Sequence, residues 1–307
     1  MKVMVTGATG YAGFAASLAL RRAGHRVFGL VRSDTSEVAK RLVQHEVSLV
    51  VGTLSDPDSL GDTFAEMDAF VHTVFDRRDP VATDQKFLQQ LAKSAAGSSR
   101  PKGLIYTTGC SIYGKVPERI MDETTPGNPE CPLAFRMTQE QEVLAMSAIR
   151  KVVVRPGFMY GGDARSSMSG LWFQASVEAK KAGAPLRYFG SPDKHWSWVH
   201  IDDLATAYVT ILDRLSSLDG EIFCLADEQR VSALEGAKAS ARAAGHSGEI
   251  EMRPAAEGGF FMIASDQDEL ITSAKARRLL GWVPQHTGYL DELPLYFAAW
   301  QAAAHGR

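Results

Sequence analysis

The sequence has few cysteines and no long apolar segment. Its 307 residues contain three cysteines, Cys110, Cys131 and Cys224, which are too few and too scattered for a disulfide framework. No two of them have the spacing of metal ligands, so we predict no metal site. No apolar run approaches the roughly 18 residues that span a bilayer, and the first residues are strand-like rather than a signal sequence. We therefore expect a soluble protein of the reducing cytoplasm.

The sequence also lacks an excess of charge of one sign. Its formal net charge is −3 and its isoelectric point is near 6.3, which excludes bulk attraction to nucleic acid or to an anionic membrane. We therefore expect a small molecule as the binding partner, and neither nucleic acid nor a membrane.

The first half of the chain alternates short runs rich in β-branched residues with helical patterns, which is typical of a parallel sheet flanked by helices. The predicted strands are 3–6, 26–31, 47–51, 69–73, 103–107 and 151–155. The predicted helices between them are 11–23, 36–44, 57–64, 80–95 and 132–149.

After Arg155 the pattern loosens into longer loops with glycine, serine and aromatic residues, which indicates a second lobe. Ser273 is predicted to cap a helix that ends at Gly281. The elements predicted in this half are strands at 196–200 and 221–225, and helices from Asp202 or Asp203 to about 215, at 274–280 and at 288–304.

The segment GATGYAG, from Gly7 to Gly13, lies between the first predicted strand and the first predicted helix. Small residues there allow a tight turn and leave helix N–H groups pointing toward a phosphate. A glycine triplet alone is a weak signal, but this strand and helix are the context that a dinucleotide-binding loop requires. The cofactor-binding residues predicted in this loop are Gly7, Thr9, Gly10, Tyr11, Ala12 and Gly13.

The end of the second predicted strand indicates which dinucleotide binds. Val31 occupies the position of the acidic residue that would hold the ribose hydroxyls of NAD, and Arg32 follows it. A guanidinium there suits the 2′-phosphate of NADP, although an exposed arginine beside Asp34 is the structural alternative. We predict NADP(H) in preference to NAD(H), with Arg32 and Ser33 as cofactor-binding residues.

Five segments together resemble the extended short-chain dehydrogenase/reductase family, in its epimerase/dehydratase-like group. They occur in the order of the family and extend over nearly the whole chain. They are 6–13 (TGATGYAG), 107–114 (TTGCSIYG), 155–161 (RPGFMYG), 196–205 (WSWVHIDDLA) and 273–282 (SAKARRLLGW).

The resemblance implies an α/β fold, in which a Rossmann doubly wound parallel sheet carries a smaller C-terminal α/β substrate lobe. It assigns residues 1–158 to an NADP-binding Rossmann domain, to which 196–226 returns, and residues 159–195 and 227–307 to the substrate-binding lobe. A homodimer formed through the helices predicted at 80–95 and 132–149 is also implied. The further cofactor contacts that it implies are Thr53, Leu54, Thr73, Thr107, Pro156, Gly157 and Met159.

The acid–base pair of this family is missing. The family's tyrosine, four residues before a lysine, maps to Phe135, and the lysine maps to Gln139. A phenol with a reference pKa near ~10 needs an adjacent ammonium to act near neutral pH, and neither residue can supply these functions. Gly109 occupies the usual Ser/Thr position.

The altered helix resembles an atypical branch in which an aromatic-Arg-x-x-x-Glu segment, here with Arg136 and Glu140, replaces the pair. An ordinary intrahelical ion pair between Arg136 and Glu140 is the alternative. Arg136 can polarise a carbonyl, but it cannot donate a proton at neutral pH because its pKa exceeds ~12. The catalytic candidates are Thr108, Ser111, Tyr113, Arg136 and Gln139.

The second half is rich in aromatic residues and predicts an apolar substrate pocket, although packing roles are the alternative for several of them. The substrate-binding candidates are Phe135, Tyr160, Arg165, Trp172, His195 and Trp196. The function we predict is an NADPH-dependent reductase of a carbonyl or polarised double bond in a hydrophobic small molecule, with a non-standard proton donor. The alternatives are a redox-neutral epimerase, dehydratase, isomerase or cyclase that uses bound NAD(P), and a non-catalytic NADP-binding sensor.

Overall fold

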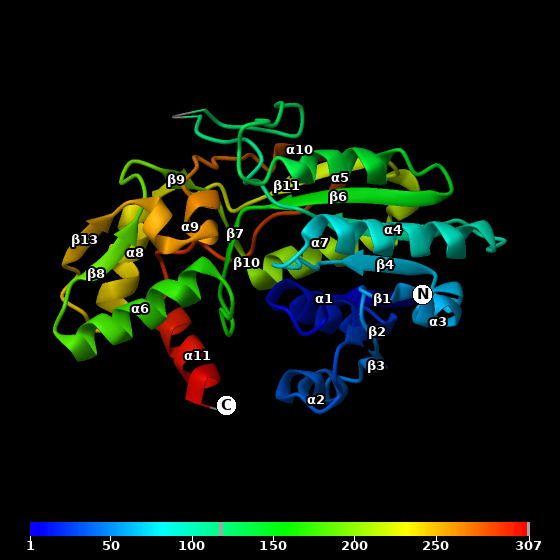
Figure 1. Cartoon of the computed structure of the whole chain (residues 1–307), viewed down its shortest axis with the longest axis horizontal. Helices are drawn as coiled ribbons and strands as arrows, with labels where there is room; N and C mark the ends of the chain where they lie inside the picture. The colour runs from blue at the N-terminus through cyan, green and yellow to red at the C-terminus, as the bar shows by residue number, and fades with distance from the viewer. Residues whose placement is uncertain (117–118, 306–307) are drawn as a thin grey trace. The chain divides into compact units, whose positions relative to one another are not determined.

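The computed structural model describes residues 1–116 and 119–305 and is built around a seven-stranded sheet (Figure 1). The strand order is β11-β6-β5-β4-β1-β2-β3, and the pairings from β6 to β3 are parallel. This is the doubly wound order of a Rossmann fold, as predicted. The strands are β1 Lys2–Thr6, β2 Arg26–Val31, β3 Ser48–Val51, β4 Ala69–His72, β5 Lys102–Thr107, β6 Ile149–Pro156 and β11 Glu221–Leu225.

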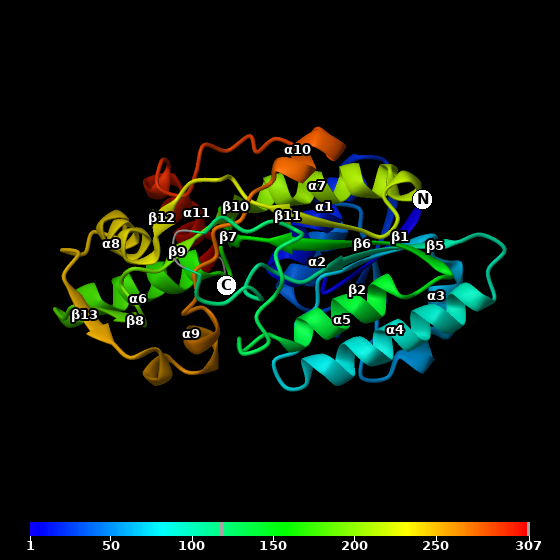
Figure 2. The same cartoon turned by 90° about the horizontal axis from the view of Figure 1, so that it is seen from above.

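The chain divides into two compact units. The first comprises Met1–Thr108, Phe135–Arg155 and Leu204–Phe223, and the second comprises Gly109–Ala134, Pro156–Asp203 and Cys224–Arg307. The helices associated with the sheet are α1 Tyr11–Arg22, α2 Glu37–Gln44, α3 Gly61–Glu66, α4 Pro80–Ala96, α5 Phe135–Leu144 and α7 Ile201–Asp213, with the short 3₁₀ helices η1 Pro57–Leu60 and η2 Leu215–Ser217. Helices α4 and α5 lie side by side on one face of the sheet, and α7 lies on the other (Figure 2).

The core of the first unit forms where α3 and α4 pack onto the sheet. Phe64, Phe70 and Phe87 are fully buried and contact one another edge-on or tilted, with ring centroids 4.8 to 6.0 Å apart. Apolar burial of this kind stabilises the unit by roughly 25 cal/mol per Å². It also fixes the carboxyl ends of β1, β4 and β5, from which the candidate site residues project.

The second unit consists of three two-stranded sheets with helices. Strand β7 (Phe158–Tyr160) pairs with β10 (Trp198–His200), β8 (Leu186–Phe189) with β13 (Ile250–Arg253), and β9 (His195–Trp196) with β12 (Val231–Ser232). The helices are α6 Met168–Ala182, α8 Ala233–Ala243, α9 Phe260–Ala264, α10 Ala274–Leu280 and α11 Leu293–His305, with the 3₁₀ helix η3 Ala255–Gly258.

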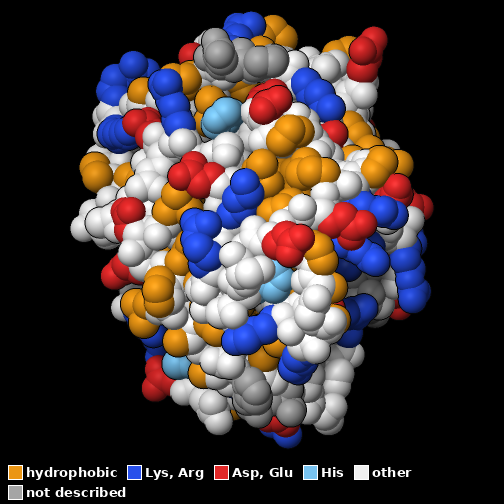
Figure 3. Space-filling view, turned by 90° about the vertical axis from the view of Figure 1, so that its left-hand side faces the viewer, with side chains coloured by type: hydrophobic (Ala, Val, Ile, Leu, Met, Phe, Trp, Pro, Cys, Tyr) orange, Lys and Arg blue, Asp and Glu red, His pale blue; other side chains and the backbone are white. Residues whose placement is uncertain are grey.

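The core of this unit is aromatic. The ring of Trp172 stacks on Trp196 with centroids 5.5 Å apart, and Trp198 stacks on Tyr289 at 4.2 Å. Met252, Phe260 and Phe261 remain exposed. On the face shown in Figure 3, basic and acidic side chains are interspersed with apolar ones.

The six strands predicted in the first half are confirmed to within two residues at each end, and several other predictions are wrong. The helix predicted at 132–149 is α5, which is shorter because Ile149 begins β6. Asp202 and Asp203 lie in the first turn of α7, which begins at Ile201, so neither precedes it as a cap. The hydroxyl of Ser273 does not cap α10, because it bonds the backbone of Ala226 instead.

Other boundaries in the second half also differ from the prediction. The strand predicted at 196–200 is two short strands, β9 and β10, and the terminal helix begins at Leu293 rather than at 288. Helices α6 and α8 were not predicted. The Ser167 cap of α6, whose hydroxyl accepts from the N–H of Gly170, and Gly183 in the left-handed conformation at its end were the local signals for α6. Within the described residues, every helix is too short or too polar to cross a bilayer.

Candidate active site

The glycine loop between β1 and α1 is shaped to receive a phosphate. Gly7 has φ +77°, and a Cβ on Gly13 would lie 2.2 Å from the Gly7 carbonyl oxygen, so packing requires both glycines. A Cβ on Gly10 would approach only that same oxygen, at 3.0 Å. Gly10 precedes α1 without a side-chain cap, and the first turn of α1 holds no acidic residue. The N–H groups of this turn therefore fit a dinucleotide pyrophosphate.

The ends of β2 and β3 hold the residues predicted at the adenosine end of the cofactor. Val31 is buried, whereas Arg32 is exposed and forms no hydrogen bond or ion pair with the described residues. The hydroxyl of Ser33 lies 2.8 Å from that of Thr35, and the hydroxyl of Thr53 lies 2.9 Å from that of Ser55. The guanidinium of Arg32 is thus available for an anionic group.

A buried polar network lies at the carboxyl ends of β1, β4 and β5. His72 contacts the Thr6 hydroxyl through Nδ1 at 2.8 Å and Asp84 through Nε2 at 3.1 Å. Because a carboxylate can only accept, His72 donates through Nε2 and accepts from Thr6 through Nδ1. The other Asp84 oxygen accepts from the Tyr106 hydroxyl and from the Gln139 amide, the latter at 3.0 Å. Burial and Asp84 both raise the pKa of Tyr106, which keeps it protonated.

Gln139 is therefore held by this network at the position of the family's lysine. Its amide nitrogen also donates to the carbonyl of Pro80 at 3.3 Å. Gln139 is 3% exposed, and its Oε1 is buried without a hydrogen-bond partner among the described residues. The side chain can accept one further hydrogen bond but carries no charge that would lower the pKa of a phenol.

Glu140, on the same helix, forms a buried ion pair with Arg155. The Arg155 guanidinium donates to both carboxylate oxygens of Glu140, through Nε at 3.1 Å and through a terminal nitrogen at 2.5 Å. The Thr108 hydroxyl also donates to Glu140, at 2.6 Å. Within the described residues Glu140 thus pairs with Arg155, and the alternative of a simple ion pair with Arg136 is wrong. Arg155 on β6 approaches both oxygens at once, which favours it.

Arg136 faces a different set of groups. Its guanidinium lies 4.9 Å from the centroid of the Phe75 ring and donates to the Thr107 carbonyl at 3.4 Å. Burial lowers its pKa, and the neighbouring Tyr106, Asp84 and Glu140 oppose that effect. The first unit thus brings Thr108, Arg136 and Gln139 into connected polar surroundings, with Phe135 half-buried at the start of α5.

The second unit contains the other predicted catalytic residues. Tyr113 is buried, and its hydroxyl donates to the Asp122 carbonyl at 2.9 Å. Ser111 is half-buried and follows Cys110, whose thiol donates to the fully buried Glu269 at 3.1 Å. Burial raises the pKa of Glu269 to about 7.

Tyr160 lies in the aromatic core of the same unit. It is fully buried and contacts Trp198, Tyr289 and Tyr296 with its ring. Burial and Asp227 raise its pKa, and burial also raises the pKa of Asp227 to about 7. Proton loss from this phenol is therefore strongly disfavoured.

Of the remaining predicted residues of this unit, some pack in the core and others make polar contacts. Trp172 and Trp196 are buried in the aromatic core, and Arg165 forms an ion pair with Asp163 at 2.7 Å. His195 is half-buried, with its backbone N–H donating to Asp268 at 3.2 Å. Of the predicted cofactor contacts, Pro156 ends β6, Met159 lies in β7, and a Cβ on Gly157 would lie 2.5 Å from the Ser197 carbonyl.

Sequence reasoning missed His72, Asp84, Glu269 and Asp227. His72 ends a predicted strand at the edge where such sheets bind ligands, which was an available signal. Asp84 lies within an amphipathic helix and Asp227 follows a strand, and neither has a distinctive motif.

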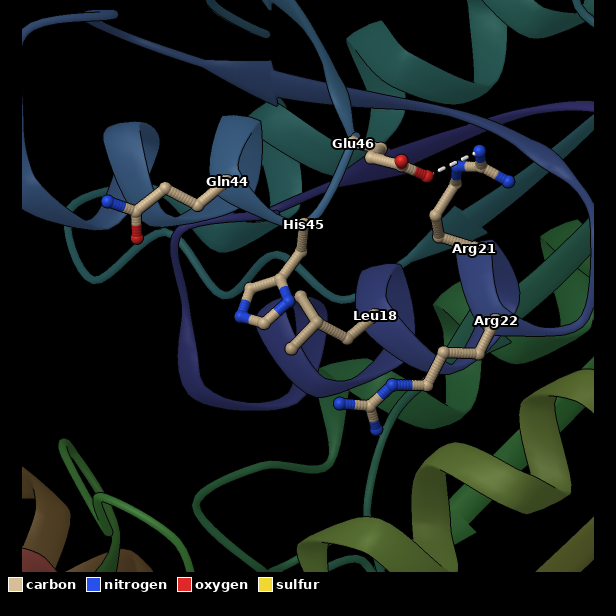
Figure 4. Close-up of a pocket in the computed structure, with 6 residues that line it drawn as sticks. All are labelled: Leu18, Arg21, Arg22, Gln44, His45 and Glu46. Atoms are coloured by element: carbon tan, nitrogen blue, oxygen red, sulfur yellow. Dashed lines mark hydrogen bonds and ion pairs between the residues drawn. The ribbon is translucent and has the colours of Figure 1, made fainter.

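A separate hollow lies at the other end of α1. It is lined by side chains from the second half of α1, from the end of α2 and from the two residues that follow α2 (Figure 4). An ion pair of 2.6 Å joins Arg21 to Glu46. The residues that line it are Leu18, Arg21, Arg22, Gln44, His45 and Glu46. Because the glycine loop precedes α1, this hollow is not the pyrophosphate site.

The chain is similar in sequence and in fold to several known proteins. An uncharacterized protein of Saccharomyces cerevisiae is 26% identical over 309 residues, which cover 95% of this chain and 98% of the other. UDP-glucose 4-epimerase of Yersinia pestis is 24% identical over 339 residues, which cover 98% of each chain. Among solved structures, a dTDP-glucose 4,6-dehydratase from Streptomyces venezuelae with NAD and DAU bound is similar with a TM-score of 0.83 at 17% identity, covering 100% of this chain and 98% of the other.

A second similar structure is UDP-glucose 4-epimerase from Bifidobacterium longum in complex with NAD⁺ and UDP. Its TM-score is 0.80 at 20% identity, and the match covers 99% of this chain and 98% of the other. These structural similarities support the fold. The sequence profile of the NAD dependent epimerase/dehydratase family matches residues 3–226. The chain therefore belongs to the NAD dependent epimerase/dehydratase family, within the extended short-chain dehydrogenases/reductases.

Proposed function

We propose that the protein is an NADP-dependent reductase of a carbonyl, or a similarly polarised double bond, in a hydrophobic small molecule. The observation that carries this proposal is that Phe135 and Gln139 replace the acid–base pair, with the Gln139 amide bound to Asp84. A redox-neutral cycle begins by oxidising an alcohol, for which a base must remove the hydroxyl proton. A reductase receives hydride from the reduced nicotinamide and needs only a proton for the developing alkoxide. Loss of the base is therefore tolerated better by a reductase.

The proposed cofactor is NADP(H), bound by the first unit. The exposed Arg32 supports it, because a guanidinium without another partner can pair with a 2′-phosphate. The Oε1 atom of Gln139 is a buried acceptor that suits a hydroxyl donor such as that of a ribose.

The proposed proton donor to the substrate is Ser111. The Thr108 hydroxyl already donates to Glu140, and the Tyr113 hydroxyl donates to the Asp122 carbonyl. Ser111 is half-buried, whereas Tyr113 is buried. Arg136 is not the donor, because its guanidinium does not give up a proton at neutral pH.

Composition supports the hydrophobic substrate and the location proposed here, and the family resemblance supports the substrate lobe and the homodimer. The aromatic residues of the second unit support a hydrophobic substrate, and that unit is proposed as the substrate lobe. A homodimer through α4 and α5 and a cytoplasmic location are proposed with it. Sedimentation of the purified protein, compared with a variant carrying a charged residue on the exposed face of α4, tests the dimer.

The test follows NADPH oxidation against a panel of hydrophobic aldehydes, ketones and enones. We expect turnover by the wild type, and we expect Arg32→Ala to weaken NADPH binding roughly 10-fold or more while NADH binding changes little. Arg26→Ala is the matched control, because Arg26 is also exposed and lies at the opposite end of β2. Turnover only by the double variant Phe135→Tyr/Gln139→Lys would contradict the proposal.

The second candidate is a redox-neutral epimerase or dehydratase that uses bound NAD(P). Family membership favours it, as do similar structures that hold NAD and are epimerases or dehydratases by name. Cofactor that copurifies with the protein and returns to its starting redox state after turnover of a sugar nucleotide would favour this candidate over the reductase.

A further inference from the structure

Glu269 is a buried carboxyl that the site described above leaves without a function. It is fully buried, and its backbone is fixed beside β9 and β10. Its N–H donates to the carbonyl of His195 at 2.9 Å, and its carbonyl accepts from the N–H of Ser197 at 2.9 Å. The side chain therefore starts from a rigid position.

The carboxyl of Glu269 faces the loop that follows β5. The Cys110 thiol donates to Oε2 at 3.1 Å. The Ser111 hydroxyl lies close enough to influence the carboxyl, yet Oε1 accepts no well-aligned hydrogen bond from the described residues. A buried carboxylate oxygen without such a bond is costly, because ionised oxygens need donors when they leave water. The pairing around Glu269 thus suits a carboxyl that holds a proton.

The charged and titratable groups around Glu269 act in opposite directions. Burial is the largest effect and raises its pKa to about 7, with a smaller contribution from Asp268. The nearby hydroxyl of Ser111, the thiol of Cys110 and the ammonium of Lys194 oppose this rise. A group that exchanges its proton near neutral pH is matched to general acid work.

We propose that Glu269 supplies the proton that replaces the family's missing phenol, passing it through the hydroxyl of Ser111. This inference rests on the proposed reductase function. Ser111 is half-buried and can meet a substrate, whereas Glu269 is fully buried and acts only through its neighbour. Glu269 is therefore a proton-supplying and positioning residue, and Ser111 is the residue in contact with substrate.

Reduced nicotinamide, when bound, would supply a hydride to a carbonyl substrate. Its C–H bond would break as a new C–H bond forms at the carbonyl carbon, and the electron pair of the C=O π bond would move to oxygen. The oxygen takes the proton of the Ser111 hydroxyl, and Ser111 takes the proton of the Glu269 carboxyl. After the product leaves, Glu269 regains a proton from solvent through the half-buried hydroxyl of Ser111. The carbonyl is thereby reduced to an alcohol, with reduced nicotinamide as the reductant.

The first measurement is an infrared pH titration of the cofactor-free protein. In the wild type we expect the protonated-carboxyl bands of two buried groups, Glu269 and Asp227, to disappear near pH 7. Glu269→Gln should remove one of these bands, and Asp227→Asn should remove the other. The S–H stretching band of Cys110 should shift in the same titration, because its acceptor changes charge. Ser111→Ala should move the Glu269 band, and Glu66→Gln, whose side chain is 64% exposed, is the control that should leave the buried bands unchanged.

The second measurement is the pH profile of NADPH-driven reduction. The wild-type rate should fall as pH rises through 7, because Glu269 loses its proton. Glu269→Gln should abolish this fall in rate near pH 7, the alkaline limb of the profile, and should slow the reaction by roughly 10²-fold. Cys110→Ala should keep the limb at a displaced pH, because it removes only a neighbour of the carboxyl. A purely structural Glu269 would lower the rate without removing the limb.

The infrared titration and the pH profile together distinguish failure of this inference from failure of the proposed function. A Glu269 carboxyl that titrates in its ordinary acidic range, or a Glu269 band that Ser111→Ala leaves in place, overturns the inference whatever the activity. Wild-type rate and pH profile in Glu269→Gln overturn it as well. An infrared titration near pH 7 in a protein that reduces none of the panel overturns the reductase proposal and leaves the coupled pair of Glu269 and Ser111 established.

Discussion

Asp84 in the first unit and Glu269 in the second are both buried carboxyl groups, and their surroundings are very different. Asp84 accepts hydrogen bonds from His72, Tyr106 and Gln139. Glu269 accepts a single well-aligned side-chain bond, from the thiol of Cys110. A carboxylate with three donors fixes its neighbours in place, whereas one with a weak donor readily takes up a proton. Two carboxyl groups that are buried to a similar extent therefore have different roles, and the number and type of hydrogen-bond donors around each one determine which role it has.

The largest expected effect comes from removing the well-paired carboxylate. Asp84→Ala leaves the donors of Tyr106, Gln139 and His72 buried without their acceptor. At about 1–3 kcal/mol for each of the three stranded groups, the free energy of unfolding should fall by about 3–9 kcal/mol. Urea denaturation measures this change. Asp58→Ala is the control, because Asp58 is exposed and pairs only with Lys93, so a loss of similar size there would refute the explanation.

A smaller loss of stability is expected when the ion pair between Arg155 and Glu140, to which Thr108 also donates, is broken. Arg155→Met removes the guanidinium and leaves the Glu140 carboxylate buried with the Thr108 hydroxyl as its remaining side-chain donor. The free energy of unfolding should fall by about 3 kcal/mol in denaturant titrations. Adding Glu140→Leu to Arg155→Met should recover part of that loss, because the uncompensated charge is removed. If the double variant is less stable than the single one, the loss comes from packing instead.

Glu269, the poorly paired carboxyl, should make the free energy of unfolding depend on pH. The pKa of Glu269 is raised from 4.5 to about 7, so between these values the native state binds more protons than the unfolded state. Its contribution to stability is therefore lost as pH rises through this window and levels off above pH 7. Relative to wild type, Glu269→Gln should gain about 3 kcal/mol between pH 4 and 8. Thermal unfolding at several pH values measures this difference, and a difference that does not vary with pH would contradict it.

The fold could be predicted from the sequence because its signals are local. The alternation of strands and helices in the first half and the glycine loop depend on residues close together in the chain, and both were confirmed. Helix α6 was missed because glycine, serine and aromatic residues obscured its periodicity. Helix α8 is rich in alanine and follows the Ser232 cap, so its local signals were available and were overlooked.

The site could be predicted only in part because tertiary contacts select its partners. Spacing within α5 offered an ion pair between Arg136 and Glu140 as one alternative, but β6 presents Arg155 to the same carboxylate. Ser273 was expected to cap α10, and its hydroxyl is bound by the backbone of Ala226 instead. Glu269 lies 159 positions from Cys110, so no local pattern could have joined them. The roles predicted for Thr108, Ser111 and Arg32 stay predictions.

The smallest expected effect comes from removing a hydrogen-bond donor of the Asp84 network rather than its acceptor. Tyr106→Phe removes a hydroxyl but leaves Asp84 with His72 and Gln139, so no buried donor is stranded. The free energy of unfolding should fall by about 1 kcal/mol, the net value of one hydrogen bond. In a double-mutant cycle with Asp84→Ala, the Tyr106→Phe change should cost less than it does in the wild type, because its acceptor is already gone. Equal losses in both backgrounds would show that the hydroxyl contributes through packing, and Asp84 would then depend on fewer donors than the geometry indicates.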